Sequence, residues 1–277
     1  MPKPTNTRAP IASDVAHLIA PFAVPLAATK KPAVQVELSP LDDDDATISK
    51  LGGYAYMPAG AAYPTGSDGK ALVLLAQIRF EEMPRMEGYP TVGMLQFFIG
   101  ETEFYGANFD GDFSPEVLSV QKDFRVVFHE NIVNPVTTKS VAESTLLPHQ
   151  PSAPMRMQFS AAHEVMSSSD FRFNKLTGGS YLKTVESYAE ANGVDIDRLW
   201  DAIGEQQHNG RGHKIGGYAM FTQEDPRTTL GLELLFQLDT DDENIMWGDA
   251  GVGGFFISAE DLKRKDFSRV MYNWDCY

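Results

Sequence analysis

Runs of apolar residues separated by turn residues predict a protein rich in β-strands. Leu72–Ile78, Thr91–Ile99 and Asp123–Phe128 are short and rich in apolar or β-branched side chains, which is typical of strands covered on both faces. Between them lie clusters of Gly, Ser and Asp, such as Gly66–Gly69, that favour turns. Helical patterns are segregated from these strands rather than alternating with them. The pattern therefore predicts an α+β fold.

The same pattern occurs twice along the chain. The Leu-Gly-Gly-Tyr segment that begins at Leu51 returns as Ile-Gly-Gly-Tyr at Ile215, and three further segments return in the same order. The spacing between the copies falls steadily, from 164 residues at this pair to 160, 158 and 143 at the later ones. Loop shortening after an internal duplication would produce this trend, so we expect two related β-rich halves. The later pairs are Gln77 with Gln237, Phe97 with Phe255, and Asp123 with Asp266.

The repeat predicts four parts in the chain. A disordered arm and a short helix precede the first copy, a linker rich in proline joins the copies, and the second copy carries an insertion. The expected bounds are 1–31 for the arm and helix, 32–134 for the first repeat, 135–153 for the linker and 154–277 for the second repeat.

The insertion in the second copy is expected to be helical. A strand that begins after Pro32 matches one that begins after Pro154, only 122 residues later, whereas the glycine pairs lie 164 residues apart. The second copy therefore holds 42 additional residues, within 164–210. Apolar residues recur there at helical spacing on both sides of Asn192-Gly193, with Asp195 as an N-cap, which predicts two helices.

Composition and charge exclude several classes of protein. The 277 residues include 23 basic and 38 acidic ones, a net charge of −15. Nucleic acids are bound by neutralising phosphates with Lys and Arg, so we expect no nucleic-acid partner, whereas a basic protein partner is favoured. The sequence has neither a membrane-spanning apolar stretch nor a secretory signal, so a cytoplasmic location is expected. The one cysteine, Cys276, excludes an intrachain disulfide and a Cys-rich metal site.

No catalytic signature is found in the sequence. The Gly-Gly pairs lack the Gly-Lys-Ser/Thr ending of a phosphate loop, and aromatic residues that favour strands follow them, so we expect kinks at strand starts. His163-Glu164 lacks the second histidine of a zinc-protease helix. We expect no metal site, and no cofactor is indicated.

Candidate binding residues come from two features. Gln77 and Gln237 lie inside apolar strands, where each either bonds to the backbone or faces a cleft between the copies. The second copy also has segments that the first lacks, with polar side chains and a tryptophan wall suited to a pocket. Its glycine-flanked Asp249 either caps its own turn beside a buried Trp247 or serves as a carboxylate for metal or acid–base chemistry. The candidates in the second copy are Gln223, Asp225, Arg227, Trp247, Asp249 and Trp274.

These segments resemble the YwqG-like family of uncharacterised bacterial proteins. The resemblance rests on the Leu-Gly-Gly-Tyr start, the Leu-Leu-Ala-Gln-Ile strand, the His-Lys-Ile-Gly-Gly-Tyr block, the Trp-Gly-Asp-Ala-Gly segment and the C-terminal Trp-Asp-Cys, and covers roughly residues 32–277. It implies an α+β fold with internal duplication, and it brings no accepted activity or catalytic residue. Members are associated with bacterial toxin systems as immunity or accessory proteins.

Two functions remain open from the sequence. The first is a non-enzymatic cytoplasmic binding protein of the immunity type, which neutralises a basic toxin domain. The Asp42–Asp45 run, expected to be a solvated loop, is its candidate contact surface. The alternative is a small-molecule-binding protein or enzyme with a pocket in the C-terminal repeat.

Overall fold

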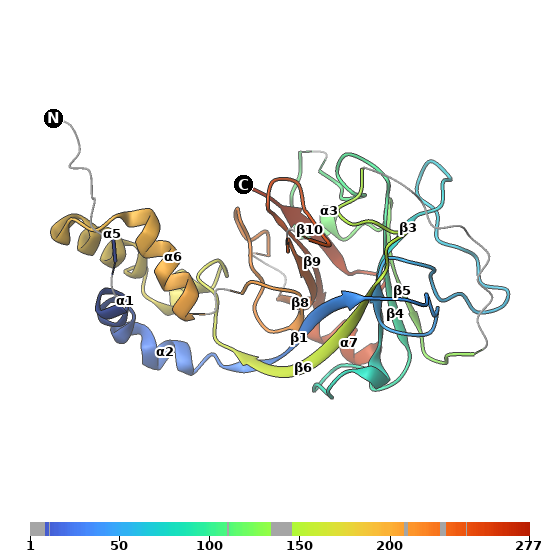
Figure 1. Cartoon of the computed structure of the whole chain (residues 1–277), viewed down its shortest axis with the longest axis horizontal. Coiled ribbons are helices and arrows are strands. Elements are labelled where there is room, and N and C mark those ends of the chain that lie inside the picture. Colours follow the sequence, from blue (N-terminus) through green and yellow to red (C-terminus); the bar gives the residue numbers. More distant parts are fainter. Residues whose placement is uncertain are drawn as a thin grey trace. The chain divides into compact units, whose positions relative to one another are not determined.

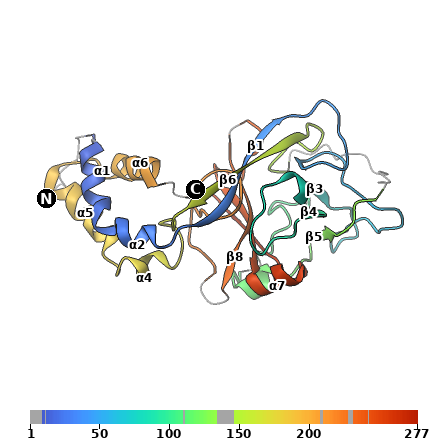
Figure 2. The same cartoon turned by 90° about the horizontal axis from the view of Figure 1, so that it is seen from below.

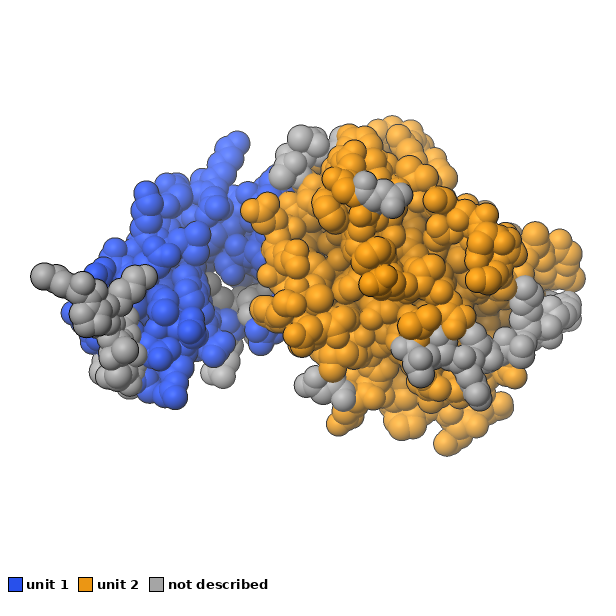
Figure 3. Space-filling model, turned by 90° about the horizontal axis from the view of Figure 1, so that it is seen from above, with its two compact units in different colours: residues 1–31, 163–211, 217–220 blue, residues 32–162, 212–216, 221–277 orange. Residues whose placement is uncertain are grey.

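The computed structural model divides into two compact units (Figure 3). Unit 1 comprises residues 1–31, 163–211 and 217–220, and unit 2 comprises 32–162, 212–216 and 221–277. Most of the expected N-terminal arm and residues 134–145 of the expected linker region lie outside the described residues. The structure describes residues 9–10, 12–109, 111–133, 146–207, 210–227, 231–241 and 243–277.

Unit 2 is built on a mostly antiparallel sheet that forms a nearly closed barrel (Figures 1 and 2). The described strands are β1 (Lys31–Pro40), β2 (Lys50–Leu51), β3 (Val73–Arg79), β4 (Met94–Ile99), β5 (Phe124–His129), β6 (Met155–Glu164), β7 (Lys214–Gly216), β8 (Leu232–Asp239), β9 (Val252–Ser258) and β10 (Met271–Asp275). Their order in the sheet is β10-β9-β8-β7-β1-β6-β2-β3-β4-β5. The described helices of this unit are short: η2 (Phe80–Glu82), α3 (Pro115–Leu118) and α7 (Ala259–Arg264). Strands dominate and helices are segregated, as the sequence predicts.

Aromatic and branched side chains fill the interior of the barrel. β4 is buried along its whole length because both of its faces are covered, which explains its continuous apolar sequence. The ring of Phe97 lies 4.9 Å from that of Phe236 and 4.6 Å from that of Phe255, measured between centroids. These contacts join strands from the two expected repeats in one core, so neither repeat has a separate interior.

The pair β2 and β3 and the pair β7 and β8 have the same register. On β2 and β3, Lys50 lies opposite Gln77, and on β7 and β8, Lys214 lies opposite Gln237. The pairing of β3 with β4 and of β8 with β9 is irregular at the same place, one to three residues before each glutamine. These irregularities lie between Leu74 and Ala76 and between Leu234 and Phe236.

The first strand of each expected half lies beside the other half. β1 pairs with β7, with Val34 opposite Ile215, and β6 pairs with β2, with Met155 opposite Leu51. Figures 1 and 2 show β1 and β6 running side by side between the two sets of strands. Val34 beside Ile215 and Met155 beside Leu51 thus take similar positions 121 residues apart, close to the expected spacing of 122.

The register also corrects the expected match between the two end strands. Val126 lies opposite Phe97 and Tyr272 lies opposite Phe255, so β5 and β10 correspond at a spacing of 146 residues rather than 143. The reason is a turn that separates the second Lys-Asp-Phe segment from β10, whereas the first runs directly into β5. Asp275, at the end of β10, thus takes the position that His129 has on β5.

The glycine pairs form kinks, as expected, but these lie at the ends of β2 and β7 rather than at strand starts. The φ angles are 66° at Gly52, 74° at Gly53, 66° at Gly216 and 68° at Gly217, in the left-handed region that favours glycine. A Cβ on Gly53 would lie only 2.6 Å from the carboxylate of Asp44. No helix follows either pair, so neither resembles a phosphate loop.

Unit 1 is helical and combines the N-terminal segment with the insertion. Its helices are α1 (Ala12–Ile19), η1 (Ala20–Phe22), α2 (Ala23–Ala27), α4 (Phe173–Leu176), α5 (Tyr181–Asn192) and α6 (Ile196–Gln207). Leu18 of α1, Val185 of α5 and Leu199 of α6 are buried in one apolar core. The predicted break is confirmed, because α5 ends at Gly193 with a φ of 62° and Asp195 accepts a hydrogen bond from the Arg198 N–H. No described helix of the chain is long and apolar enough to cross a membrane.

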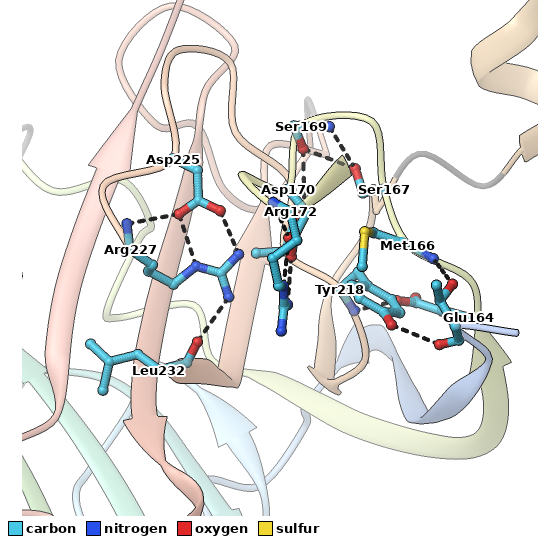
Figure 4. Close-up of polar contacts among 12 residues, drawn as sticks. Glu164, Met166, Ser167, Ser169, Asp170, Arg172, Tyr218, Asp225, Arg227 and Leu232 are labelled. Atoms are coloured by element: carbon cyan, nitrogen blue, oxygen red, sulfur yellow. Dashed lines mark hydrogen bonds and ion pairs between the residues drawn. The ribbon is translucent and has the colours of Figure 1, made fainter. Parts of the chain in front are cut away.

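Polar contacts tie distant segments of unit 1 together (Figure 4). The backbone N–H of Tyr218 donates to Glu164 at 2.8 Å, and the Tyr218 hydroxyl donates to the carbonyl of Thr29 at 2.6 Å. The Thr29 hydroxyl in turn accepts from the N–H of Met166 at 2.9 Å. This short network fixes the N-terminal segment to the insertion.

Candidate functional site

Gln77 and Gln237 are fully buried and bonded to the backbone. The Gln77 side chain accepts from the Tyr56 N–H at 3.0 Å and donates to two carbonyl groups of 46–48, at 2.9 and 2.7 Å. Gln237 donates to the carbonyl of Gly212 at 2.9 Å. Each glutamine therefore holds the loop before β2 or β7 against the sheet, which is a structural role.

Asp225 and Arg227 form a buried ion pair (Figure 4). The guanidinium donates to both carboxylate oxygens, at 2.9 and 2.6 Å, and to the carbonyl of Leu232 at 3.3 Å. Its carbon lies 4.8 Å from the centre of the Phe256 ring and 5.3 Å from that of Phe221. Since Arg227 is only 1% exposed, it supports the loop rather than contacting a ligand.

The same pairing occurs in unit 1 between Asp170 and Arg172. There the backbone N–H of the arginine and its Nε both donate to one carboxylate oxygen, at 3.0 and 2.8 Å, and a terminal nitrogen donates to the other at 2.7 Å. Asp-x-Arg thus forms a local turn in these two places. The two segments are Asp170-Phe171-Arg172 and Asp225-Pro226-Arg227, and the pairing was not among the features predicted from the sequence.

Trp247 is buried as predicted, but Asp249 does not cap its turn. Trp247 is 0% exposed, and its ring lies 5.6 Å from that of Tyr105. The carboxylate of Asp249 is exposed, and no side-chain hydrogen bond joins it to a described residue. The turn is held by backbone bonds instead, since the N–H of Gly251 donates to the carbonyl of Trp247 at 2.8 Å.

The capping carboxylate of this region is Asp241. It accepts from the backbone N–H groups of Glu243, Asn244 and Ile245, at 3.1, 2.7 and 3.0 Å, and from the Asn244 side chain. Burial raises the pKa of Asp241, but these hydrogen bonds outweigh that effect and lower it to about 2. Aspartate in such loops hydrogen-bonds the backbone that follows it, so the sequence signal was present eight residues before the predicted Asp249.

The acidic run at 42–45 is partly used by its own fold. Asp44 forms an ion pair with the buried Lys50 and accepts from the Tyr54 N–H at 2.7 Å. Asp45 accepts from the N–H and hydroxyl of Thr47, both at 2.8 Å. The run lies in a loop with Asp42, Asp43 and Asp45 exposed, as expected, but Asp44 is half-buried and only Asp42 and Asp43 have no such side-chain role.

A pocket of about 800 Å³ opens beside β10 in unit 2. It lies between the loop that joins β4 to α3, the 223–226 loop and the last residues of the chain. In Figure 1, α3 lies next to β10. The lining residues are Phe104, Phe109, Phe113, Ser114, Pro115, Glu116, Gln223, Glu224, Asp225, Pro226, Asn273, Trp274, Asp275 and Cys276.

Aromatic rings form one wall of this pocket. The ring of Phe109 lies 5.6 Å from Phe104, 5.5 Å from Phe113 and 5.9 Å from Trp274, measured between centroids. The Trp274 ring is fixed by a 2.9 Å hydrogen bond from its Nε1 to the carbonyl of Phe104, and by Tyr105 at 4.8 Å. Phe104 and Phe113 remain 45% and 56% exposed, so the wall faces the open pocket.

Asp275 contributes a buried carboxylate to the pocket lining. One oxygen accepts from the N–H and hydroxyl of Thr222, at 2.9 and 2.7 Å. The other, Oδ2, is buried and has no hydrogen-bond partner among the described residues. Burial, together with the nearby negative charge of Asp225, raises the pKa of Asp275, although the Thr222 hydrogen bonds and the backbone N–H of Gln223 act in the opposite direction.

The structure brings some of the predicted residues together and not others. Gln223, Asp225 and Trp274 line the pocket, Arg227 and Trp247 are buried, and the two strand glutamines are not among the lining residues. The sequence analysis missed Phe104, Phe109, Phe113, Glu116 and Asp275. The density of aromatic residues in the 104–114 loop was the signal for the three phenylalanines, and the C-terminal Trp-Asp-Cys segment was the signal for Asp275. Among the described residues, no group of three or more His, Cys, Asp or Glu side chains is placed to hold a metal ion.

One known protein family matches most of the chain. The family described as "Domain of unknown function (DUF1963)" matches residues 49–276. The chain belongs to this family. The match covers β2 to β10, and with them the whole pocket lining. No curated protein matches the sequence.

Proposed function

We propose that this chain is a binding protein that holds a small organic ligand in the pocket beside β10. The observation that supports it is the aromatic wall, whose Phe104 and Phe113 rings remain about half exposed. Leaving apolar surface in water costs about 25 cal/mol per Å², and a flat ligand stacked on these rings would remove that contact. A volume of about 800 Å³ is within the usual range for ligand pockets.

The proposal is the alternative that the sequence left open, with a different set of residues. Trp274 stays in the binding wall and Gln223 among the polar groups, whereas Asp225 and Arg227 support the loop between them. The added residues come from the 104–116 segment. A rigid tryptophan beside less constrained phenylalanines suits a flat, apolar group.

A thermal-shift screen with flat probes tests the proposal. Indole and naphthalene derivatives are the first probes, because they match the aromatic wall. A ligand at a hundred times its Kd stabilises a protein by about 2.7 kcal/mol, and each kcal/mol shifts Tm by roughly 2–4 °C at this size. A screen without shifts would contradict the proposal.

A matched pair of variants locates the binding. Phe113→Ala removes an exposed ring of the wall, whereas Tyr54→Ala removes a ring that is 41% exposed elsewhere on unit 2. We expect Phe113→Ala to weaken binding of a hit while leaving Tm nearly unchanged, and Tyr54→Ala to change neither. Equal effects of both variants would place the binding outside the pocket.

A basic protein partner is the second candidate, and the distribution of charge favours it. Unit 1 carries nine basic and nine acidic residues, so the other 14 basic and 29 acidic residues, and the whole net charge of −15, belong to unit 2. Such an asymmetric charge attracts a basic surface and speeds its association. An immunity-type protein that neutralises a basic toxin domain, in the cytoplasm, is the form of this candidate that the resemblance to YwqG-like proteins suggests.

Co-purification with the product of a neighbouring gene tests this second candidate. We expect a basic protein to bind at low salt and to be released as salt rises, because screening weakens surface charge interactions. The double variant Asp42→Lys, Asp43→Lys changes only the two aspartates of the run that have no structural partner. Binding that changes neither with salt nor in this variant would contradict a role of the acidic surface in the complex.

We further infer that the sheet arose by internal duplication. The equal registers of Lys50 with Gln77 and of Lys214 with Gln237 support this origin, as do the irregularities that precede both glutamines. The positions of β1 and β6 also agree with a duplication. Each is the first strand of its half, and each pairs with a strand of the other half.

A further inference from the structure

We propose that the ligand of this pocket is an organic cation, an amine or guanidinium joined to a flat apolar group, and that Asp275 is the residue that selects it. This inference rests on the proposed function, since it names the class of ligand for the same pocket. Three independent features of unit 2 support it: the charge of the lining, the unused oxygen of Asp275 and the position of the rings.

The lining of the pocket is acidic. It contains four carboxylates and, among the described residues, neither Lys, Arg nor His. Asp225 is neutralised by Arg227, which leaves Glu116, Glu224 and Asp275. No ion pair joins these three to a described basic side chain. An anion would meet uncompensated repulsion there, whereas a cation would be attracted.

The surroundings extend this negative charge. The chain from Glu101 to Gln121, which forms the aromatic side of the pocket, has five acidic residues and no basic one. The 223–226 loop adds Glu224 on the opposite side. The pocket therefore lies in a region of negative potential that raises the local concentration of cations.

Asp275 has the geometry of an acceptor that awaits a donor. The residue is only 9% exposed, and Thr222 already holds Oδ1, which fixes the plane of the carboxylate. Oδ2 has no donor among the described residues. A buried acceptor without a partner is unfavourable, and an N–H of a bound cation would satisfy it with a charge-assisted hydrogen bond. The raised pKa of Asp275 agrees with a carboxylate that lacks a nearby cation.

Trp274 also lines the pocket and supplies the second half of the recognition. Its ring is held by the Phe104 carbonyl and packs against Tyr105, so its orientation is fixed before a ligand binds. Cations bind favourably over the face of an indole ring, and flat apolar groups stack on it. A ligand with an amine close to an aromatic ring would therefore contact Asp275 and Trp274 together.

Three probes that share an indole ring test the charge. Tryptamine is cationic, 3-ethylindole is neutral and indole-3-propionate is anionic, and they differ little in size. Isothermal titration calorimetry on the full chain should give the tightest binding for tryptamine, by roughly tenfold or more over 3-ethylindole, and the weakest for indole-3-propionate. Equal binding of all three would overturn the inference but keep the proposed function, whereas no binding by any probe would contradict both.

A fourth probe tests the acceptor itself. N,N,N-Trimethyltryptammonium keeps the charge and the ring but has no N–H on its cationic nitrogen. If Oδ2 of Asp275 accepts a hydrogen bond from the ligand, this probe should bind more weakly than tryptamine. Equal affinities for this probe and tryptamine would mean that the ring faces select the charge, and would contradict the role of Asp275.

Two aspartate variants complete the test. Asp275→Asn keeps the shape and the acceptor for Thr222, and it should lower the affinity for tryptamine to that for 3-ethylindole without changing the latter. Asp249→Asn removes an exposed carboxylate that does not line the pocket and should change neither affinity. Unchanged tryptamine binding by a folded Asp275→Asn protein would overturn the inference. If Asp275→Asn does not fold, Glu224→Gln takes its place and should lower the affinity for tryptamine by about threefold. An unchanged preference of that variant for tryptamine among the four probes would overturn the inference.

Discussion

Asp225 and Arg227 lie two residues apart and satisfy each other through both carboxylate oxygens, beneath the loop that borders the pocket. The pair contributes to the pocket by fixing the 223–226 loop, because Gln223 and Glu224 on the same loop face the opening. Two residues that the sequence suggested as ligand contacts are thus supports for neighbouring contacts.

Arg227→Met should be strongly destabilising. It leaves the carboxylate of Asp225 buried without its cation, which costs about 3–5 kcal/mol in the free energy of unfolding. Arg264→Met removes an arginine whose side chain is 52% exposed. It pairs with the exposed Glu260 and with Asp261, which keeps Arg269 as a partner, so the loss should be less than about 1 kcal/mol. Urea denaturation of both variants measures the difference. Similar losses for the two arginines would argue against a structural role for Arg227.

Asp241→Ala should destabilise the protein, whereas Asp249→Ala should not. Losing a capping carboxylate costs about 0.5–2 kcal/mol, and only Asp241 accepts backbone N–H groups. Because the folded pKa of Asp241 is lowered to about 2, its contribution is present above the unfolded value of 3.8 and is lost as the pH falls toward 2. Urea titrations of wild type and both variants at pH 6 and pH 3 check this. A larger loss in Asp249→Ala would reverse the assignment.

His149 should make the protein less stable in mild acid. It is fully buried, and although its Nε2 bonds to the Leu74 carbonyl at 3.0 Å, burial lowers its pKa from 6.5 to about 4. Between these values the unfolded chain binds the proton and the folded chain does not, so stability falls as the pH decreases from 6.5 to 4. The full effect amounts to about 3 kcal/mol.

His149→Gln should remove this slope while keeping a donor for the Leu74 carbonyl. The exposed His163 provides the control, as His163→Gln. Unfolding free energies at pH 7 and pH 4.5 for the three proteins measure the effect. A slope that persists in His149→Gln would have to come from other groups.

Asp44→Asn should destabilise the protein much more than Asp43→Asn. Burial lowers the pKa of Lys50, and its hydrogen bond and ion pair with Asp44 act in the opposite direction. Without that carboxylate the buried ammonium loses its counter-charge, at a cost of about 3 kcal/mol. Asp43 is exposed, so its replacement should stay within about 0.5 kcal/mol. Thermal unfolding compares them, and equal Tm values would contradict the pairing.

The sequence predicted the local elements well and the pocket poorly, for physical reasons. β4, α5 and the kinks at the glycine pairs follow from periodicity and backbone preference, which act over a few residues. The pocket depends on closure of the barrel, which brings the loop after β4 to β10 although these strands lie far apart in the sheet order. Phe124 and Tyr272, on the first and last strands of that order, come within 5.2 Å between ring centres. No local pattern in the sequence encodes that approach.

The exchange of first strands between the halves also bears on how the chain is made. β2 to β5 pair with their neighbours in sequence, so they can associate soon after synthesis. β1 cannot, because its partners are β6 and β7, and Ile215 is translated 181 residues after Val34. At roughly 5–20 residues per second, this interval is about 10–35 s on the ribosome. Until β6 is translated the growing sheet has an unpaired edge at β2, and until β7 is translated β1 lacks its second partner, so this is the period in which the protein most needs protection from aggregation.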